Sequence, residues 1–403
     1  MIILICKSGQ GVANERMSFY IKTGMNKTFY YLLFILFWPC HAYARQAIYY
    51  AGQSYSTNSE SIPTLFKYTD SALGKEDVRI NLNKQIMEMI SNNPKYEFIA
   101  HENTDSRKFG KATVLALSID NEIVSLEKID GKYKILYELS AQALYFDFYE
   151  KQVLGSYPFT LTFVDLFSSQ PTNKQVQESV DRFLLRSNNN PLVTEFTKLV
   201  NQSEIPQAAS KRLRIKSIEL SGDAAKWIPR SINPEDQKII YGHEFSKYIS
   251  THLDLPVLPA SVGRVIGNEM TAKFSNGDVY SLKIPEEDYA VSFKINWFKK
   301  LASAKNNVAT VYVFGAGTEV RIYEPLSGKI YFDSPMKLGA TKTVPATQEN
   351  IDDWAAISGV MSQLFDEFAK NIRSPEKEWM KTHLGSDKSK EIKALNKLIG
   401  ESR

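Results

Sequence analysis

The strongest constraint on the fold is a series of predicted strands and helices that occurs twice, in the same order, after residue 45. Each half carries several strand-like segments and then an amphipathic helix. In the first half, Leu144–Tyr149 alternates between two faces, and a helical stripe of apolar residues follows Pro171. In the second half, strand-like Ala290–Asn296 precedes an amphipathic closing helix over Ile351–Ile372. The sequence predicts an α+β fold of two tandem domains, each a mainly antiparallel sheet packed with amphipathic helices.

The chain divides into five predicted parts. Residues 1–44 form a leader, 45–202 the first α/β domain, and 212–373 the second. The polar stretch 203–211 is the predicted linker, and 374–403 a charged C-terminal tail. A length of 403 residues agrees with two domains of ordinary size.

The two halves correspond position by position at two places. Pro158 matches Pro335, and Thr172 matches Thr347, in the same order ahead of an amphipathic helix. Thr172 and Gln175 predict a capping box at the start of the first of these helices. Gene duplication followed by divergence explains this order. The alternative is that unrelated α/β domains share it, and the sequence leaves both open.

The leader has the pattern of a secretory signal peptide. Phe29–Trp38 is an uncharged apolar run of about 15 Å as a helix, too short for a bilayer of about 30 Å. Lys27 precedes it, and small residues at Ala42 and Ala44 form an A-x-A cleavage site. We expect cleavage after Ala44 and a true start near Met25, with the preceding residues an upstream extension.

The leader also carries both cysteines, Cys6 and Cys40. Lipidation at Cys40 stays an alternative, although Trp38 and Pro39 stand where small residues are needed. The full chain has 49 basic and 45 acidic residues, and removal of the leader leaves 45 and 44. The mature chain is therefore nearly neutral and free of thiols, which suits an oxidising compartment and argues against a nucleic-acid partner.

No catalytic, cofactor-binding or metal-ligating residue is predicted. His243–Glu244 begins like a metalloprotease helix, but Lys247 stands where the second histidine is needed. Ser334–Lys337 matches S-x-x-K without the motifs that should accompany it. Gly315–Gly317 follows a strand as a phosphate-binding loop would, but it lacks a third glycine and a following helix, so we expect a turn or bulge there. We expect Glu286–Asp288 to be a solvated cluster of charges.

Four tyrosines are the predicted partner surface: Tyr145, Tyr149, Tyr323 and Tyr331. They lie on hairpins, and tyrosine is enriched at interfaces. The alternative is that they form a second packed face against the helices.

The tail has a short apolar face formed by Ile392, Leu395, Leu398 and Ile399, with lysines opposite. This face favours either peripheral contact with an anionic membrane or a partner, or a frayed terminal helix. No segment is long and apolar enough to be predicted as a membrane span.

The segment Thr318–Pro335 carries a resemblance to a known family. Its strand with arginine, glycine-containing turn and returning strand resemble the end of the envelope α/β domain shared by CsgG, the LpoB-type lipoproteins and the amino-terminal domain of TolB. The strand Gln46–Ala51, the helix Leu82–Ile90 and the strand Tyr96–Ile99 fit the same domain. The resemblance covers most of two copies, 46–185 and 212–372.

The chain departs from that family in having no lipidation box and no evident pair of long alternating strands. The resemblance implies a non-catalytic periplasmic domain that binds protein, and it transfers no functional residue. We therefore predict an exported periplasmic or secreted binding or accessory protein of a Gram-negative envelope, with an envelope protein as partner. The rival is an exported hydrolase of cell wall or polymer whose site is assembled from distant residues.

Overall fold

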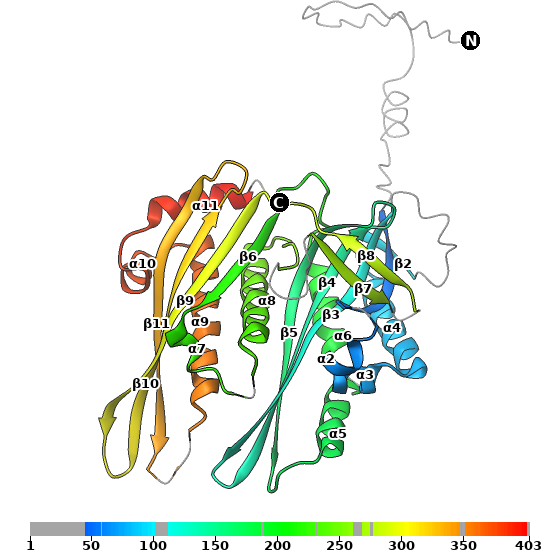
Figure 1. Cartoon of the computed structure of the whole chain (residues 1–403). Helices are drawn as coiled ribbons and strands as arrows, with labels where there is room; N and C mark the ends of the chain where they lie inside the picture. The colour runs from blue at the N-terminus through cyan, green and yellow to red at the C-terminus, as the bar shows by residue number, and fades with distance from the viewer. Residues whose placement is uncertain are drawn as a thin grey trace, which may run out of the picture. The chain divides into compact units, whose positions relative to one another are not determined.

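The computed structural model describes residues 45–57, 59–100, 112–186, 189–230, 232–260, 268–274, 277–346, 348 and 351–400. Gln46–Arg403 forms one compact unit, built on a seven-stranded and a four-stranded sheet (Figure 1). The predicted α+β class is confirmed. The predicted leader, with Met25, Cys40 and the cleavage site after Ala44, lies outside the described residues.

The first sheet has the strand order β2-β1-β3-β4-β5-β8-β7. Its strands are β1 (Gln46–Tyr55), β2 (Tyr96–Ala100), β3 (Thr113–Ile129), β4 (Lys132–Asp147), β5 (Gln152–Phe167), β7 (Glu269–Phe274) and β8 (Val279–Lys283). β1 is parallel to β2 and β3, and β3, β4 and β5 follow as antiparallel neighbours. The hairpin between β3 and β4 turns at Asp130 and Gly131, both with positive φ, as a tight two-residue turn requires.

The second sheet has the order β11-β10-β9-β6. Its strands are β6 (Leu213–Leu220), β9 (Tyr289–Lys305), β10 (Ala309–Tyr323) and β11 (Ile330–Pro345). β6 is parallel to β9, and β9, β10 and β11 are antiparallel. The predicted turn before β11 is present, with Gly328 at φ 69°.

The two halves share an order of pairings. The neighbouring strands of the first half follow the order β2, β1, β3, β4, β5. The second half has the order β6, β9, β10, β11, preceded by a short segment in the position that β2 has in the first. That segment is Leu255–Pro259, where Leu258 pairs parallel with Arg214 of β6. Val257 pairs antiparallel with Ser156 of β5 through hydrogen bonds of 2.8 and 3.0 Å. The segment therefore ties the last strand of the first half to the first strand of the second.

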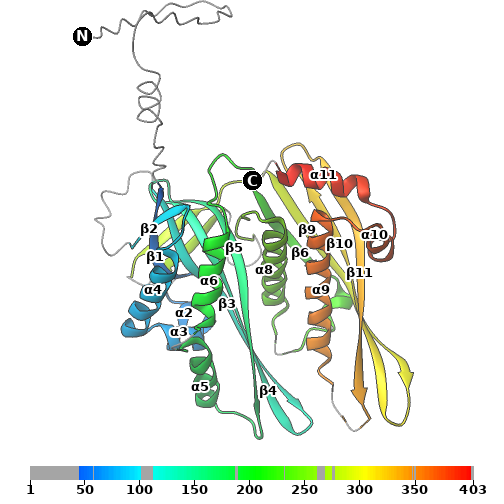
Figure 2. The same ribbon diagram turned by 180° about the vertical axis from the view of Figure 1, so that it is seen from behind.

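Helices cover one face of each sheet. The helices of the first half are α2 (Ile62–Leu65), α3 (Lys67–Leu73), α4 (Glu76–Ile90), α5 (Asn173–Leu184) and α6 (Pro191–Gln202). Those of the second are α7 (Gly222–Ala225), α8 (Pro234–Leu253), α9 (Asp353–Arg373), α10 (Lys377–Leu384) and α11 (Ser389–Gly400). Figure 2 shows α4 and α6 in front of the first sheet and α9 in front of the second. α8 packs against β5, β6 and α9, so it contributes to both halves.

Helix starts follow the sequence closely in the first half and less so in the second. The predicted capping box of α5 is present: the Thr172 side chain accepts from Gln175 N, and the Gln175 side chain from Thr172 N. α9 is instead capped by Asp352, whose side chain accepts from Ala355 N. Thr347, the expected counterpart of Thr172, lies outside the described residues.

Three expectations need correction. The strands are longer than predicted: β3, β4, β5, β9, β10 and β11 each span 15 to 17 residues, so the chain does contain long paired strands. β7 and β8 belong to the first sheet although they fall within 212–373, so the two sheets do not divide at the predicted linker. Gly315 and Gly317 lie inside β10 rather than in a turn, but the register with β9 shifts between Gly317 and Thr318, so the predicted bulge is confirmed. The Trp297 side chain lies over Gly317, where a Cβ would clash.

The C-terminal tail is part of the fold. Its helices α10 and α11 bury Met380, Leu384, Ile392, Leu395 and Leu398 in the core of the second half. They also lie along β11: the His383 Nδ1 is 2.9 Å from the Lys337 carbonyl, and Lys388 reaches the Asp333 carbonyl at 3.5 Å. The apolar face predicted to contact a membrane is therefore covered by protein. No helix among the described residues combines the length and the apolar character that crossing a membrane requires.

Candidate functional site

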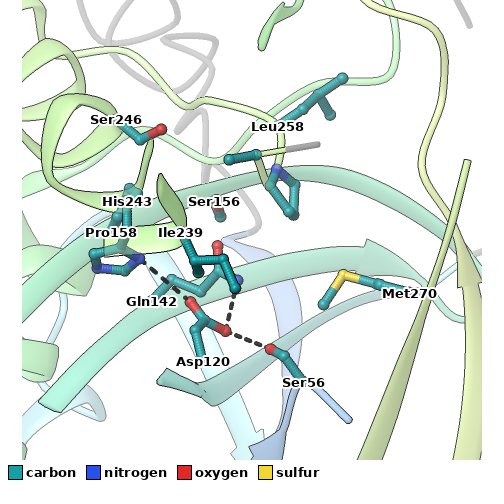
Figure 3. A pocket seen from close by; sticks show the side chains of 12 residues that line it. Ser56, Asp120, Gln142, Ser156, Pro158, Ile239, His243, Ser246, Leu258 and Met270 are labelled. Atoms are coloured by element: carbon teal, nitrogen blue, oxygen red, sulfur yellow. Dashed lines mark hydrogen bonds and ion pairs between the residues drawn. The ribbon is translucent and has the colours of Figure 1, made fainter. Parts of the chain in front are cut away.

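A small cavity lies between the first sheet and α8. Its volume is about 70 Å³, which is room for a few water molecules. Figure 3 shows the polar side chains gathered there from β3, β4, β5 and α8. Ile239, Leu258 and Met270 supply apolar walls. The cavity therefore joins parts of the chain that are more than a hundred residues apart.

Asp120 is the centre of the polar network. Its Oδ1 accepts hydrogen bonds from the Ser118 hydroxyl and the Gln142 amide, both at 3.0 Å, and from the Ser56 hydroxyl. Ser118 and Gln142 are buried at 0% and 4% exposure. Hydrogen bonds to a carboxylate in such a place hold it in one orientation.

His243 faces Asp120 from α8. Its Nε2 lies 2.9 Å from the Phe159 carbonyl, so Nε2 carries the proton, and its Nδ1 is 3.6 Å from the Asp120 carboxylate. Burial lowers the pKa of His243 to about 4. The ring is therefore neutral at neutral pH, and it links the first sheet to α8 through the Phe159 carbonyl.

This arrangement does not form a nucleophilic site. Within the described residues no serine hydroxyl is hydrogen-bonded to His243; Ser56 and Ser118 bond to the carboxylate instead. The Ser246 hydroxyl, one turn further along α8, is buried without a hydrogen-bond partner in the described part of the chain. A serine nucleophile needs the histidine as its base, and that contact is not made.

The predicted tyrosine surface does not assemble. Tyr145 is 1% exposed and packs edge-on against Tyr157, so it cannot contact a partner in this fold. Tyr149 is 70% exposed in the turn before β5. Tyr323 and Tyr331 are half-buried, and Tyr331 packs against Tyr289. The alternation in Leu144–Tyr149 was predicted correctly, but the sheet is covered on both faces at that point.

Some exposed apolar residues lie where both sheets extend beyond their parallel strands, whereas others are exposed outside these extensions, namely Ile80, Met89, Val279, Leu326 and Ile330. Past the end of β1, residues 121–129, 132–139 and 160–167 continue as a three-stranded ribbon. Past the end of β6, residues 296–305, 309–317 and 337–345 do the same. We call these the first and second ribbons. Exposed apolar side chains on them are Leu126, Val164, Leu166 and Leu301, at 43 to 62% exposure, and Val308, at 77%, lies in the turn that joins β9 to β10.

The remaining sequence candidates have structural roles. The Ser334 hydroxyl bonds to the adjacent Pro335 carbonyl at 3.0 Å. His252, a further histidine of α8, bonds to Asp366 at 2.6 Å. Glu287 is not solvated as predicted, because it is 8% exposed and pairs with Lys216 at 2.7 Å and Arg214 at 3.5 Å. The described residues contain no group of three metal-ligating side chains.

Sequence reasoning missed Asp120. It follows Ser118 and Ile119 in a strand pattern, and nothing in the spacing connects it to His243, which is 123 positions later. A polar residue that breaks an apolar strand, facing inward, was the only available signal.

No family model matches the sequence, and no curated protein matches it. Among solved structures, the hypothetical protein CT253 from Chlamydia trachomatis has 10% identity and a TM-score of 0.25 over 40% of this chain and 96% of its own. A PelC variant from Paraburkholderia phytofirmans, described as a dodecamer, has 10% identity and a TM-score of 0.20, over 43% and 95%. A putative neuraminyllactose-binding hemagglutinin homolog from Helicobacter pylori has 13% sequence identity and a TM-score of 0.24. The match covers 45% of this chain and 92% of that one. Similarity at this level gives no evidence about the function of this chain.

Proposed function

We propose that the mature chain is an exported, non-catalytic binding or accessory protein of a Gram-negative cell envelope. The leader pattern supports export, and the resemblance to the CsgG, LpoB and TolB domain supports a periplasmic role in protein binding. The partner is an envelope protein, and the ribbons are the surface that it contacts.

The observation that carries the proposal is the exposure of apolar side chains on both ribbons. Leu166 and Leu301 are 61% and 62% exposed, and Val308 is 77% exposed. Apolar side chains that gather on an extended surface mark interaction sites more often than single exposed ones do. Val164 and Leu166 share one face of the first ribbon, whereas Leu126 lies on its opposite face and Leu301 is a single exposed residue of the second ribbon.

The rival hydrolase draws its support from the cavity with Asp120 and His243. Its weakness is geometric, because His243 uses Nε2 on a backbone carbonyl and no serine hydroxyl reaches the ring in the described residues. We expect Asp120→Asn and His243→Ala to leave partner binding unchanged. Hydrolysis of an envelope polymer that Asp120→Asn abolishes would favour the rival instead.

The test is crosslinking in living cells. A photo-crosslinking amino acid at Leu166 or Leu301 should capture an envelope protein, whereas the same group at exposed Lys393 on α11 should not. Leu166→Asp and Leu301→Asp should weaken the captured complex by about tenfold each. Sequencing of the protein from the periplasmic fraction should start at Arg45.

Two results would contradict the proposal. One is a chain that retains Met1 and stays in the cytoplasm. The other is capture of the same proteins from Leu166, Leu301 and Lys393, since that would show no preference for the ribbons.

A further inference from the structure

A larger cleft lies between the first ribbon and helices α8 and α9. Its volume is about 310 Å³, within the range of sites that hold small ligands. The ribbon contributes Ile123, Leu136 and Val164 as one wall, and α8 contributes Ile240 on the other side. These walls are apolar, so a ligand here needs an apolar body.

The polar lining of the cleft is strongly acidic. The charged residues that line it are Glu127, Lys134, Glu138, Glu244 and Asp352. Lys134 is already engaged, since it pairs with Glu127 at 3.1 Å and with Asp352. When all five are ionised the lining carries a net charge of −3, and one cation is not enough to balance it.

Glu138 and Glu244 form the deepest acidic pair. Glu244 accepts a hydrogen bond from the Ser362 hydroxyl, while Glu138 has no hydrogen bond or ion pair within the described residues. Burial, followed by the charge of Glu244, raises the pKa of Glu138 to about 7; burial also raises the pKa of Glu244. Lys247 on α8 opposes both shifts without forming an ion pair with either. The pair therefore lacks a cation of its own.

A second, uncharged group in the cleft is also unpaired. Tyr241 is 1% exposed and lines the cleft, and its hydroxyl has no hydrogen-bond partner within the described residues. The Gln237 and Ser358 side chains lie beside this hydroxyl and act to lower the pKa of Tyr241, although neither meets strict hydrogen-bond geometry. A buried hydroxyl without a well-formed hydrogen bond is destabilising unless a ligand or water bonds to it.

We propose that this cleft binds an alkylammonium group, with the ammonium between Glu138 and Glu244 and the alkyl chain against the ribbon wall. An ammonium offers three N–H donors, which match two carboxylates and the Tyr241 hydroxyl oxygen. The source is either a free alkylamine or the side chain of a lysine in a partner. The inference goes beyond the proposed function, because it stands even if the ribbons bind nothing.

The test uses n-butylammonium and Nα-acetyl-lysine methylamide as probes of the two sources, by titration calorimetry on the mature chain at pH 8. Saturable binding of either probe supports the site, and preference for one identifies the source. Neutral n-butanol should not bind, because it lacks the charge. Glu138→Gln and Glu244→Gln should each weaken binding by about tenfold or more, since each removes a charged acceptor.

The pH profile separates this site from a surface effect. Cation binding requires ionised carboxyls, so affinity should rise between pH 6 and pH 8, as Glu138 loses its proton. The rise should be smaller in Glu138→Gln, where Glu127, whose pKa burial also raises to about 7, still titrates. Glu195→Gln, half-buried on α6 and paired with Lys198 away from the cleft lining, is the matched control and should bind as the unaltered chain does. Absence of saturable binding by the folded chain up to about 50 mM of both probes would overturn the proposal. So would unchanged affinity in folded Glu138→Gln.

Discussion

The two sheets differ in what covers their second faces. In the first sheet, Val114, Ala116, Leu144 and Phe146 turn away from α4 and α6 and are buried beneath β7 and β8. In the second sheet, the corresponding side carries Lys294, Glu319 and Arg321, which are exposed. The same order of pairings therefore supports a layer covered on both sides in one half and on one side in the other.

The last strands of the two halves differ in the same way. The β5 edge is paired with Val257, which belongs to the second half. Among the described residues no such segment pairs with the β11 edge, and α10 and α11 contact it instead. An uncovered edge strand invites pairing with other chains, so the tail has a protective role in this fold.

The largest expected effect tests the covered face. Phe146→Ala should lower the free energy of unfolding by about 3–5 kcal/mol, because it removes a ring that packs 5.9 Å from Phe274. Arg321→Ala, on the open face, should change it by no more than about 1 kcal/mol, since its pair with Asp333 is exposed. Urea unfolding followed by circular dichroism measures both. Equal losses of unfolding free energy in the two variants would contradict the difference between the covered face of the first sheet and the open face of the second.

The second prediction concerns the tail. Leu395→Ala should lower the free energy of unfolding by about 2–5 kcal/mol, because Leu395 is 1% exposed in the core. Lys393→Ala, exposed on the same helix, should change it by less than about 0.5 kcal/mol. Hydrogen exchange of β11 should speed up in the first variant only. A tail that merely frayed in solution would give no difference between the variants.

The third prediction concerns pH. The pKa of Glu138 is about 7 in the fold against 4.5 unfolded, so the folded state binds a proton more tightly and stability falls as pH rises from 4.5 to 7. Glu138→Gln removes this loss and should be more stable than the unaltered chain at pH 8, by up to about 3 kcal/mol. At pH 4 the advantage should vanish. Unfolding curves of both proteins at pH 8 and pH 4 test this prediction. A stability gain in Glu138→Gln that is the same at both pH values would contradict it.

The smallest effects compare the two helix starts. Thr172→Ala should cost about 1 kcal/mol, through loss of the α5 cap. Asp352→Ala should cost more, because Asp352 caps α9 and also pairs with Lys134 of the first ribbon. Asp352→Asn keeps a capping oxygen and loses the charge, so it should lie between the unaltered chain and the alanine variant. Thermal unfolding of the four proteins gives the order.

Local patterns predicted the elements well where the partner lies nearby in sequence. The Thr172–Gln175 capping box and the closing helix needed only residues within a few turns. Strand lengths were predicted poorly, because β9 ends in the lysine-rich 299–305, which has little apolar alternation. That part is a strand because β10 pairs with it, which no local pattern records.

The sequence by itself determined the α+β class, the repeated order of strands and helices, and the absence of any familiar catalytic motif. Only the tertiary structure decided which faces are covered, that Tyr145 is buried and Leu166 exposed, and that Asp120 meets His243. The physical reason is that periodicity fixes which residues share a face of an element. What that face contacts depends on the packing of segments far apart in the chain, such as Glu138 of β4 and Glu244 of α8.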